Sequence, residues 1–286
     1  MSSRLTIRVG LRYISAQERF GVFRTIKQWK RQRREQRRRE RLNDPNRYPP
    51  DMERDVVDTI IRVKDYTMTS MERLHGLCEA VRYVSTAGIE GDVVECGVWR
   101  GGSMMAIADM LKKQGDVTRH LHLFDTFCGM SDPTDEDVTI HGETAETLME
   151  VESKEDATSV WCVSNLQDVQ THMSSIGYPE EKIHYYEGMV EDTIPQGAPA
   201  KISLLRLDTD FYESTRHEME HLFPRLSDGG VLIVDDYGHW AGAKQAVDEY
   251  FETHGIALML NRLDYTGRIG IWNRAMTRVH SLPQAA

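Results

Sequence analysis

Short apolar runs alternate with amphipathic stretches over most of this chain. Between residues 92 and 273 the sequence changes repeatedly from a buried-strand pattern, as in Asp92–Val98, to a helical one. We predict helices at 101–113, 167–176, 214–226 and 242–252, and strands at 92–98, 120–125, 183–187, 202–208, 231–235, 257–262 and 267–273. Strands that alternate with helices are typical of a doubly wound sheet. The pattern therefore predicts an α/β fold with a mostly parallel seven-stranded sheet, to which the closing hairpin adds an antiparallel strand.

The residues before this alternation have a different pattern. Residues 22–42 are charged and helical in character but lack a wide apolar stripe, and the three prolines within 43–50 end that helix. Two further helical stretches lie between Asp55 and Thr86 and are interrupted near Tyr66–Ser70. We predict a basic N-terminal arm over 1–50, followed by one domain over 51–286 that begins with cap helices.

Charge divides the chain at the same place. Residues 1–50 carry 15 basic and 4 acidic side chains, a net charge of +11, whereas 51–286 carry 20 and 41, a net charge of −21. A polybasic arm can bind nucleic acid, an anionic membrane surface or the acidic body of another subunit, or it is a solvated helix without a specific partner. The acidic body argues against nucleic acid. We expect a homo-oligomer assembled through the N-terminal region, with peripheral contact to an anionic surface as the alternative.

Hydropathy and cysteine spacing bear on location. The sequence has no apolar run of about 18 residues, as a membrane span requires. The N-terminus has no continuous apolar signal region, and residues 1–17 only weakly resemble a transit peptide. The four cysteines lack C-x-x-C spacing and are expected to be reduced and mostly buried. We therefore expect a cytoplasmic protein.

Glycines follow the first predicted strand, and an acidic residue precedes them. The loop from Glu95 to Ser103 includes Gly97 and Gly101 but is not the G-x-G-x-x-G of dinucleotide-binding proteins. An acid two residues before the glycine suits a ligand with an ammonium group, such as the amino-acid end of S-adenosylmethionine. Ser103 and the helix N-terminus either meet that ligand's carboxylate or cap the helix. Asp125 ends the second strand, where an acidic residue commonly binds ribose hydroxyls, so we predict an adenosine cofactor.

Carboxylates follow the fourth and fifth predicted strands, which end at the same sheet edge. Like charges placed this closely favour a cation, and an all-oxygen ligand set favours Mg²⁺. We predict Asp208, Asp235 and Asp236 as the metal ligands, although Asp210 or Asp236 could instead cap the following helix or turn. Asp208 is the candidate general base, with Asp210 and His239 as alternatives. His239 is otherwise an ordinary exposed loop residue.

A second pattern, His217-Glu-Met-Glu-His221, matches the H-E-x-x-H of zinc proteases. At about 100° per residue, the apolar side chains Met219, Leu222 and Phe223 share one helix face and the two histidines lie on the opposite face. We therefore predict solvent-facing histidines and no zinc site.

Four motifs occur in an order that is typical of one family: Val94-Glu-Cys-Gly-Val-Trp-Arg-Gly-Gly-Ser103, Phe124-Asp-Thr-Phe-Cys-Gly-Met130, Leu205-Arg-Leu-Asp-Thr-Asp-Phe-Tyr-Glu-Ser-Thr215 and Asp235-Asp-Tyr-Gly238. From about Thr67 to Trp272 the chain resembles the macrocin O-methyltransferases, which are S-adenosylmethionine- and Mg²⁺-dependent sugar O-methyltransferases of antibiotic biosynthesis. The resemblance implies a Rossmann-like class I methyltransferase fold and methyl transfer to a sugar hydroxyl of a glycosylated natural product.

The resemblance also implies roles for individual residues. Glu95, Gly97 and Ser103 would contact the methionine end of the cofactor, Asp125 its ribose, and Asp208, Asp235 and Asp236 the metal. The segment Tyr66–Thr69, with Thr67 and Met68, is similar to the part of the family that folds over the cofactor. The chain departs from the family at Thr209, usually glycine, and at Phe211, commonly leucine. Residues 127–165 are divergent and are expected to shape the acceptor pocket.

Two other classes of function are compatible with parts of the sequence. The same chemistry on a catechol or another phenolic diol is the nearest alternative, since a metal can chelate either pair of hydroxyls and lower the pKa of one. A nucleic-acid-binding or scaffolding protein that uses the basic arm is the alternative from another class.

Overall fold

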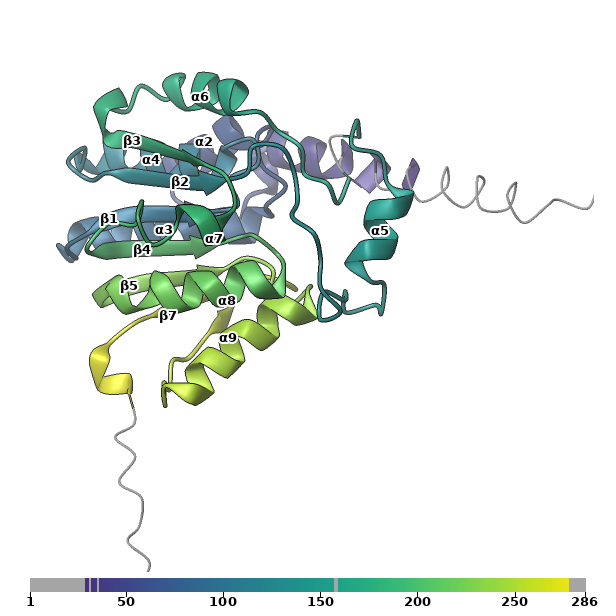
Figure 1. Ribbon diagram of the computed structural model, residues 1–286. Helices are drawn as coiled ribbons and strands as arrows, with labels where there is room; N and C mark the ends of the chain where they lie inside the picture. Colours follow the sequence, from purple (N-terminus) through teal and green to yellow (C-terminus); the bar gives the residue numbers. More distant parts are fainter. Residues whose placement is uncertain (1–28, 31, 35, 157–158, 278–286) are drawn as a thin grey trace, which may run out of the picture. The chain divides into compact units, whose positions relative to one another are not determined.

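Seven strands form one sheet, in the order β3-β2-β1-β4-β5-β7-β6, and Figure 1 shows most of them side by side. The computed structural model describes residues 29–30, 32–34, 36–156 and 159–277. Five strands are parallel, and β7 runs antiparallel to β5 and β6. Their bounds are Asp92–Cys96 (β1), Leu121–Asp125 (β2), Ile183–Glu187 (β3), Ile202–Leu207 (β4), Leu226–Val234 (β5), Asn261–Arg262 (β6) and Arg268–Ile271 (β7). The predicted mostly parallel seven-stranded sheet is confirmed.

The strand order reverses beside β1. From β1 the chain proceeds outward to β2 and β3, and it then returns to place β4 on the other side of β1. In open α/β sheets a ligand binds at the carboxyl ends of the strands where such a reversal occurs. Glu95 of β1 lies in register with Arg206 of β4, so both side chains approach this point.

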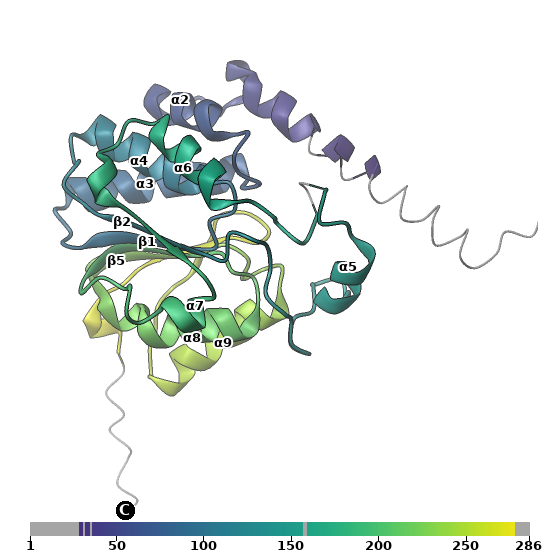
Figure 2. The ribbon, with the colours of Figure 1, turned by 45° about the horizontal axis from the view of Figure 1, so that its top comes forward.

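Helices cover both faces of the sheet, as Figure 2 shows from the side. One face carries α2 (Arg54–Val63), α3 (Met71–Thr86), α4 (Gly102–Gln114) and α6 (Leu166–Ser174), and the other carries α7 (Val190–Thr193), α8 (Tyr212–His221) and α9 (Ala241–Thr253). Each face of the sheet packs against its helices in a separate hydrophobic core. Because side chains alternate along a strand, Leu204 lies in the core beneath α2, α3, α4 and α6, and Leu205 lies in the core beneath α7, α8 and α9. Each fully buried leucine stabilises the fold by about 1.5–3 kcal/mol.

Two predicted elements differ from the observed ones. The helix predicted at 214–226 ends at His221, and a 3-10 turn over Phe223–Arg225 follows it. Pro224 has no N–H to donate and so cannot continue the helix, and the chain enters β5 at Leu226 instead of at 231. The strand predicted at 257–262 is reduced to the two residues of β6, at the sheet edge, where one neighbour alone offers hydrogen bonds.

The chain divides into two units, Met1–Arg38 and Arg39–Ala286. The predicted arm helix, 22–42, is helical in its described residues from 29 onward, and the features predicted within 1–28 lie outside the described residues. Leu42 and Tyr48 are buried in the core of the second unit, and the Tyr48 hydroxyl donates to the Leu42 carbonyl over 2.8 Å. Residues 39–50 thus pack with the domain.

The structure bears on the predictions about membrane spans and about the cysteines. Among the described residues, none of the helices combines the length and the apolar character of a membrane span. All four cysteines are free: Cys78 and Cys96 are buried, Cys162 is half-buried and Cys128 is exposed.

Three histidine rings stack across the amino ends of β2 and β3. The His184 ring lies 4.9 Å from that of His120 and 5.0 Å from that of His122. His184 Nε2 is 2.7 Å from His120 Nδ1, and Lys182 Nζ is 3.3 Å from His120 Nε2. Burial, followed by the charges of His122, His120 and Lys182, lowers the pKa of His184, and Asp92 acts in the opposite direction. The cluster therefore favours a neutral His184 ring.

We expect the free energy of unfolding to decrease as the pH falls from 7.5 to 5.5, and we expect His184→Gln to reduce that decrease. A histidine with a lowered pKa binds more protons unfolded than folded, so its contribution is complete above an unfolded pKa of about 6.5 and is lost as the pH falls through the folded value. Urea unfolding at both pH values measures this. His141→Gln, at an exposed site, is the control. Identical pH dependence in the wild type and His184→Gln would contradict the prediction.

Candidate functional site

The glycine loop after β1 lies against the end of β4. Gly97 has a φ of +78°, and its N–H donates to the Phe124 carbonyl over 2.9 Å. A Cβ at position 97 would lie 2.1 Å from the carbonyl oxygen of Asp208. Only glycine allows the β1 loop and the carboxylate-bearing end of β4 to approach this closely.

Asp125 at the end of β2 holds the same loop. Its Oδ2 accepts hydrogen bonds from the N–H groups of Val98 (2.6 Å) and Trp99 (3.0 Å), and its Oδ1 accepts one from Phe127 (2.7 Å). Burial raises the pKa of Asp125, and these three N–H donors act in the opposite direction. A carboxylate has about four acceptor positions, so the predicted contact with a ribose hydroxyl is compatible with this arrangement.

The segment Tyr66–Thr69 lies against the start of α4, beside the glycine loop. The N–H of Gly102 donates to the Tyr66 carbonyl over 3.0 Å, and a Cβ on Gly102 would be 2.4 Å from that oxygen. Thr67 is buried and its hydroxyl donates to Thr69 Oγ1, whereas Met68 is 36% exposed. The segment predicted to fold over the cofactor therefore lies next to the glycine loop.

The first turn of α4 completes this side of the site. Gly101 is the N-cap residue of α4, and Ser103 is buried within its first turn. The N–H groups at the start of a helix attract an anionic group. The predicted cofactor residues Thr67, Met68, Glu95, Gly97, Gly101, Ser103 and Asp125 thus surround the carboxyl ends of β1 and β2.

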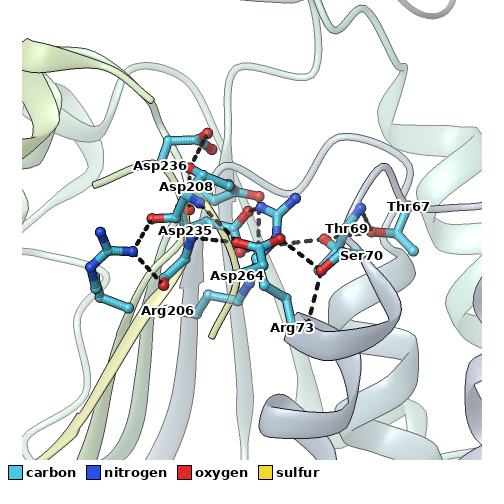
Figure 3. A network of polar contacts seen from close by, with 12 residues as sticks. Thr67, Thr69, Ser70, Arg73, Arg206, Asp208, Asp235, Asp236 and Asp264 are labelled. Carbon is cyan, nitrogen blue, oxygen red and sulfur yellow. Dashed lines mark hydrogen bonds and ion pairs between the residues drawn. The ribbon is translucent and has the colours of Figure 1, made fainter. Parts of the chain in front are cut away.

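A buried arginine links three strand ends. Arg206 of β4 is 2% exposed and belongs to the network of polar contacts in Figure 3. Its Nη1 is 2.6 Å from Glu95 Oε1 and 2.7 Å from Asp208 Oδ2, and its Nη2 is 2.6 Å from Asp235 Oδ1. Nη2 also donates to Thr69 Oγ1 over 3.4 Å. One guanidinium therefore contacts β1, the ends of β4 and β5, and the segment beside the cofactor loop.

Asp235 lies beside two arginines, Arg206 and Arg73. Its second oxygen, Oδ2, pairs with Arg73 of α3, and Arg73 Nε also lies 3.0 Å from Asp264 Oδ2. Burial acts to raise the pKa of Asp235, but Arg206 and Arg73 outweigh it and hold that pKa below the ordinary value. The N–H of Asp235 still donates to the Leu207 carbonyl, so the strand alternation continues and directs this side chain towards the two arginines.

Asp208, Asp210 and Asp236 form a converging group of carboxylates. One carboxylate oxygen each from Asp208, Asp210 and Asp236 lies within 4.8 Å of the others, and among the described residues no other three His, Cys, Asp or Glu side chains converge in this way. Burial and neighbouring carboxylates raise the pKa values of Asp208 and Asp210 well above the ordinary range, with Arg206 opposing the effect at Asp208. Thr266 donates to Asp236 Oδ1 over 3.0 Å. Such crowding of oxygen ligands is relieved by a bound cation.

His239 lies in the turn that follows Asp236. Its N–H donates to the Asp236 carbonyl over 2.9 Å, and its ring meets those of Trp240 and Tyr265 edge to face at 5.3 and 5.9 Å. The ring is half-buried, so His239 is not the fully exposed loop residue of the alternative reading.

The H-E-x-x-H residues serve a structural role in α8. The helical pattern predicts solvent-facing histidines, but His217 and His221 are half-buried, and His217 Nε2 donates to the Ile194 carbonyl over 3.0 Å. Glu218 is fully buried, and its Oε1 accepts from the Thr209 hydroxyl over 2.9 Å. These side chains are outside the converging group of described residues.

The divergent segment 127–165 packs on the loops after β4 and β5. Asp137 is fully buried, and its Oδ1 accepts from the N–H of Tyr212 over 2.7 Å at the start of α8. Met149 of α5 (Ala145–Val151) belongs to a small core with Phe211 and Trp240. The segment is thereby attached beside Asp210 and Asp236.

Sequence reasoning missed three residues of the network: Arg73, Arg206 and Asp264. Arg206 carries a signal, because a charged residue between leucines in a buried strand requires partners. Asp264 lies in the turn of the closing hairpin, where its Oδ1 accepts from the N–H groups of Thr266 and Gly267. Arg73, on an amphipathic helix, carries no such signal.

Comparison with known proteins identifies the family. The family model described as Macrocin-O-methyltransferase matches residues 8–274 of this chain. A tetracenomycin-C rhamnosyl 4′-O-methyltransferase from Streptomyces olivaceus is 32% identical over 220 residues, 77% of this chain and 80% of the relative. Mycinamicin III 3″-O-methyltransferase from Micromonospora griseorubida is 34% identical over 202 residues, 71% of this chain and 76% of the relative.

Solved structures of O-methyltransferases have the same fold as this chain. The O-methyltransferase NovP has a TM-score of 0.64 at 30% identity, over 73% of this chain and 83% of its own. The calicheamicin methyltransferase CalS11, at 18% identity, shares the fold, with a TM-score of 0.56 over 95% of this chain and 98% of its own. The Rossmann-like methyltransferase fold predicted from the sequence is confirmed. This chain therefore belongs to the macrocin O-methyltransferase family and is an O-methyltransferase, as its four motifs predict.

Proposed function

We propose that this protein transfers a methyl group from S-adenosylmethionine to a sugar hydroxyl of a glycosylated natural product, with Mg²⁺ at the acceptor side. The observation that carries the proposal is the convergence of Asp208, Asp210 and Asp236, next to a glycine loop that ends in a helix N-terminus. The first feature suits a hard cation that binds neighbouring hydroxyls, and the second suits an amino-acid end.

The residues around the glycine loop fit S-adenosylmethionine. Glu95 is 1% exposed, and its Oε2 accepts no hydrogen bond from the described residues. Burial raises the pKa of Glu95 to about 7, with Arg206 acting in the opposite direction. A buried acceptor without a donor is costly, and a ligand ammonium group would satisfy it. Bound there, the cofactor would supply an already activated methyl group.

The converging carboxylates fit Mg²⁺ in the chemistry of their donor atoms. Three carboxylate oxygens favour a hard divalent ion over zinc or copper. We assign the ligands as Asp208, Asp210 and Asp236, with Asp235 as their ion-paired neighbour. A cation held there would chelate two hydroxyls of the acceptor and lower the pKa of one.

The chain's own groups then orient the acceptor and receive its proton. Arg206 engages Asp208, and a carboxylate shared with a guanidinium and a cation is a weak base. His239, three residues after Asp236, lies in the same turn and carries an imidazole, the side chain that most often acts as a general base. Among the three predicted bases, Asp208, Asp210 and His239, we therefore assign proton removal to His239 and metal binding to the two aspartates.

The identity of the acceptor rests on relatives whose names specify sugar methylation, at a rhamnosyl group in one of them. We expect methyl transfer to glycosides that carry two neighbouring free hydroxyls, and little or none to catechols, because segment 127–165 is attached beside the carboxylates where an acceptor's remaining rings would lie. Transfer of labelled methyl to a panel of deoxysugar glycosides and catechols tests this. A preference for catechols would contradict the sugar assignment and support the phenolic alternative.

We propose further that the basic arm binds the acidic body of a second copy, in a cytoplasmic enzyme whose cysteines are free. The net charges of +11 and −21 are complementary, and their attraction is screened by salt. Light scattering after size exclusion should give an oligomer for the full chain and a single copy without residues 1–38. A monomeric full chain, or steeply salt-dependent binding of nucleic acid by the arm, would contradict this role.

A further inference from the structure

Arg206 distributes its hydrogen bonds unevenly among the carboxylates. It engages one oxygen of Glu95, Oε1, and one oxygen of Asp208, Oδ2. Asp235, in contrast, is held at both oxygens, by Arg206 at Oδ1 and by Arg73 at Oδ2. Glu95 Oε2 accepts no hydrogen bond from the described residues. The guanidinium therefore leaves the second oxygen of Glu95 for another donor, whereas each oxygen of Asp235 is ion-paired with an arginine.

The rigidity of this arrangement comes from the shape of the guanidinium. Its N–H donors have a fixed planar geometry, and each of its two terminal nitrogens lies within 2.7 Å of a carboxylate oxygen. Glu95 of β1 and Arg206 of β4 are cross-strand partners, so the sheet itself fixes their separation. An ammonium at position 206 could not bond all three carboxylates in the same orientations.

Stability alone does not account for a buried charge at this position. Well-packed apolar side chains commonly stabilise a core as well as a buried ion network does, and the flanking Leu205 and Leu207 show that apolar residues fit this strand. Without a cation among them, Glu95, Asp208 and Asp235 would take up protons or separate. Arg206 places one positive charge among these three carboxylates and fixes their directions.

We propose that Arg206 is a positioning residue shared by the two halves of the site, which aims Glu95 at the ammonium group of the cofactor and Asp208 at the divalent cation. This inference rests on the cofactor and metal assignments of the proposed function. A single change at Arg206 is therefore expected to weaken the binding of both the cofactor and the cation, although Glu95 belongs to β1 and Asp208 follows β4. Glu95 and Asp208 each serve one ligand.

Binding measurements on the full chain test the inference without turnover. Calorimetry gives the affinity for S-adenosylhomocysteine and for 5′-methylthioadenosine, which lacks the amino-acid end, and electron paramagnetic resonance gives the affinity for Mn²⁺ in place of Mg²⁺. In Arg206→Lys we expect the affinities for S-adenosylhomocysteine and Mn²⁺ each to fall about tenfold or more, since a charge-assisted hydrogen bond contributes on that order. The affinity for 5′-methylthioadenosine should change less than about twofold, since it makes no contact with Glu95.

Comparison variants separate positioning from general damage. Glu95→Gln should lower the affinity for S-adenosylhomocysteine alone, and Asp208→Asn should lower the affinity for Mn²⁺ alone. If Arg206→Lys does not fold, Asp235→Asn releases one terminal nitrogen of Arg206 while Arg73 keeps Asp264, and both affinities should fall about threefold. Unchanged affinities in the folded variant, or an equal loss for 5′-methylthioadenosine, would overturn the inference. Failure of the wild type to bind S-adenosylhomocysteine would contradict the proposed cofactor itself.

Discussion

Asp208→Asn should lower kcat for methyl transfer by at least about 10³-fold, or about 4 kcal/mol of transition-state stabilisation, while the affinity for S-adenosylhomocysteine stays within about twofold. Asparagine preserves the shape of the side chain but removes one of three charges that converge within 4.8 Å. Arg206 retains Glu95 and Asp235 as partners, so the variant keeps its buried guanidinium compensated and should fold. Initial rates with a glycoside acceptor, together with calorimetry, measure both quantities.

Two further variants serve as controls for the loss of activity in Asp208→Asn. Asp58→Asn, an exposed carboxylate on α2, should leave the rate unchanged. His239→Gln should lower the rate but retain the affinity for Mn²⁺, because His239 is assigned to the proton and not to the metal. Full activity in Asp208→Asn, or undiminished wild-type activity in excess EDTA, is incompatible with a metal at this site.

The sheet was predictable because the pattern of each strand is local. Runs such as Val231–Val234 are apolar on both faces, as strands covered by helices on both sides must be, and the alternation with helices then specifies a parallel sheet. The ends of elements were less predictable. Where α8 ended and β5 began depended on Pro224 and on pairing between Leu226 and Ile202, a contact far apart in the sequence.

The carboxylate edge was also predictable, but the division of roles within it was not. Asp235 and Asp236 are adjacent, and they point to opposite faces only if β5 continues through Asp235, as its N–H bond to Leu207 shows. The sequence does not reveal where the strand alternation stops. Arg206 meets Glu95 and Asp235 only because the order of strands places β4 between β1 and β5. Predicting which carboxylates pair with arginine requires that order.

Gly97→Ala should lower the free energy of unfolding by about 3–5 kcal/mol and abolish binding of S-adenosylhomocysteine. Two costs combine at this position: a φ of +78°, which an alanine adopts at a cost of about 1–2 kcal/mol, and overlap of the new Cβ with main-chain atoms. The carbonyl oxygen and carbon of Asp208 would lie 2.1 and 2.5 Å from that Cβ. Because these are backbone atoms, no rotamer relieves the clash, and either the glycine loop or the end of β4 must move. Urea unfolding and calorimetry measure the two effects.

Gly115→Ala separates the two costs. Gly115 at the end of α4 has a φ of +72°, close to that of Gly97, but a Cβ there meets no atom within 4 Å. Its substitution should therefore cost only the backbone strain, about 1–2 kcal/mol, with cofactor binding intact. The excess loss in Gly97→Ala then measures the contact between the cofactor loop and the strand that carries Asp208. Equal losses in the two variants would show that the loop and the strand end yield independently, and the close approach at Gly97 would then have no part in joining the two halves of the site.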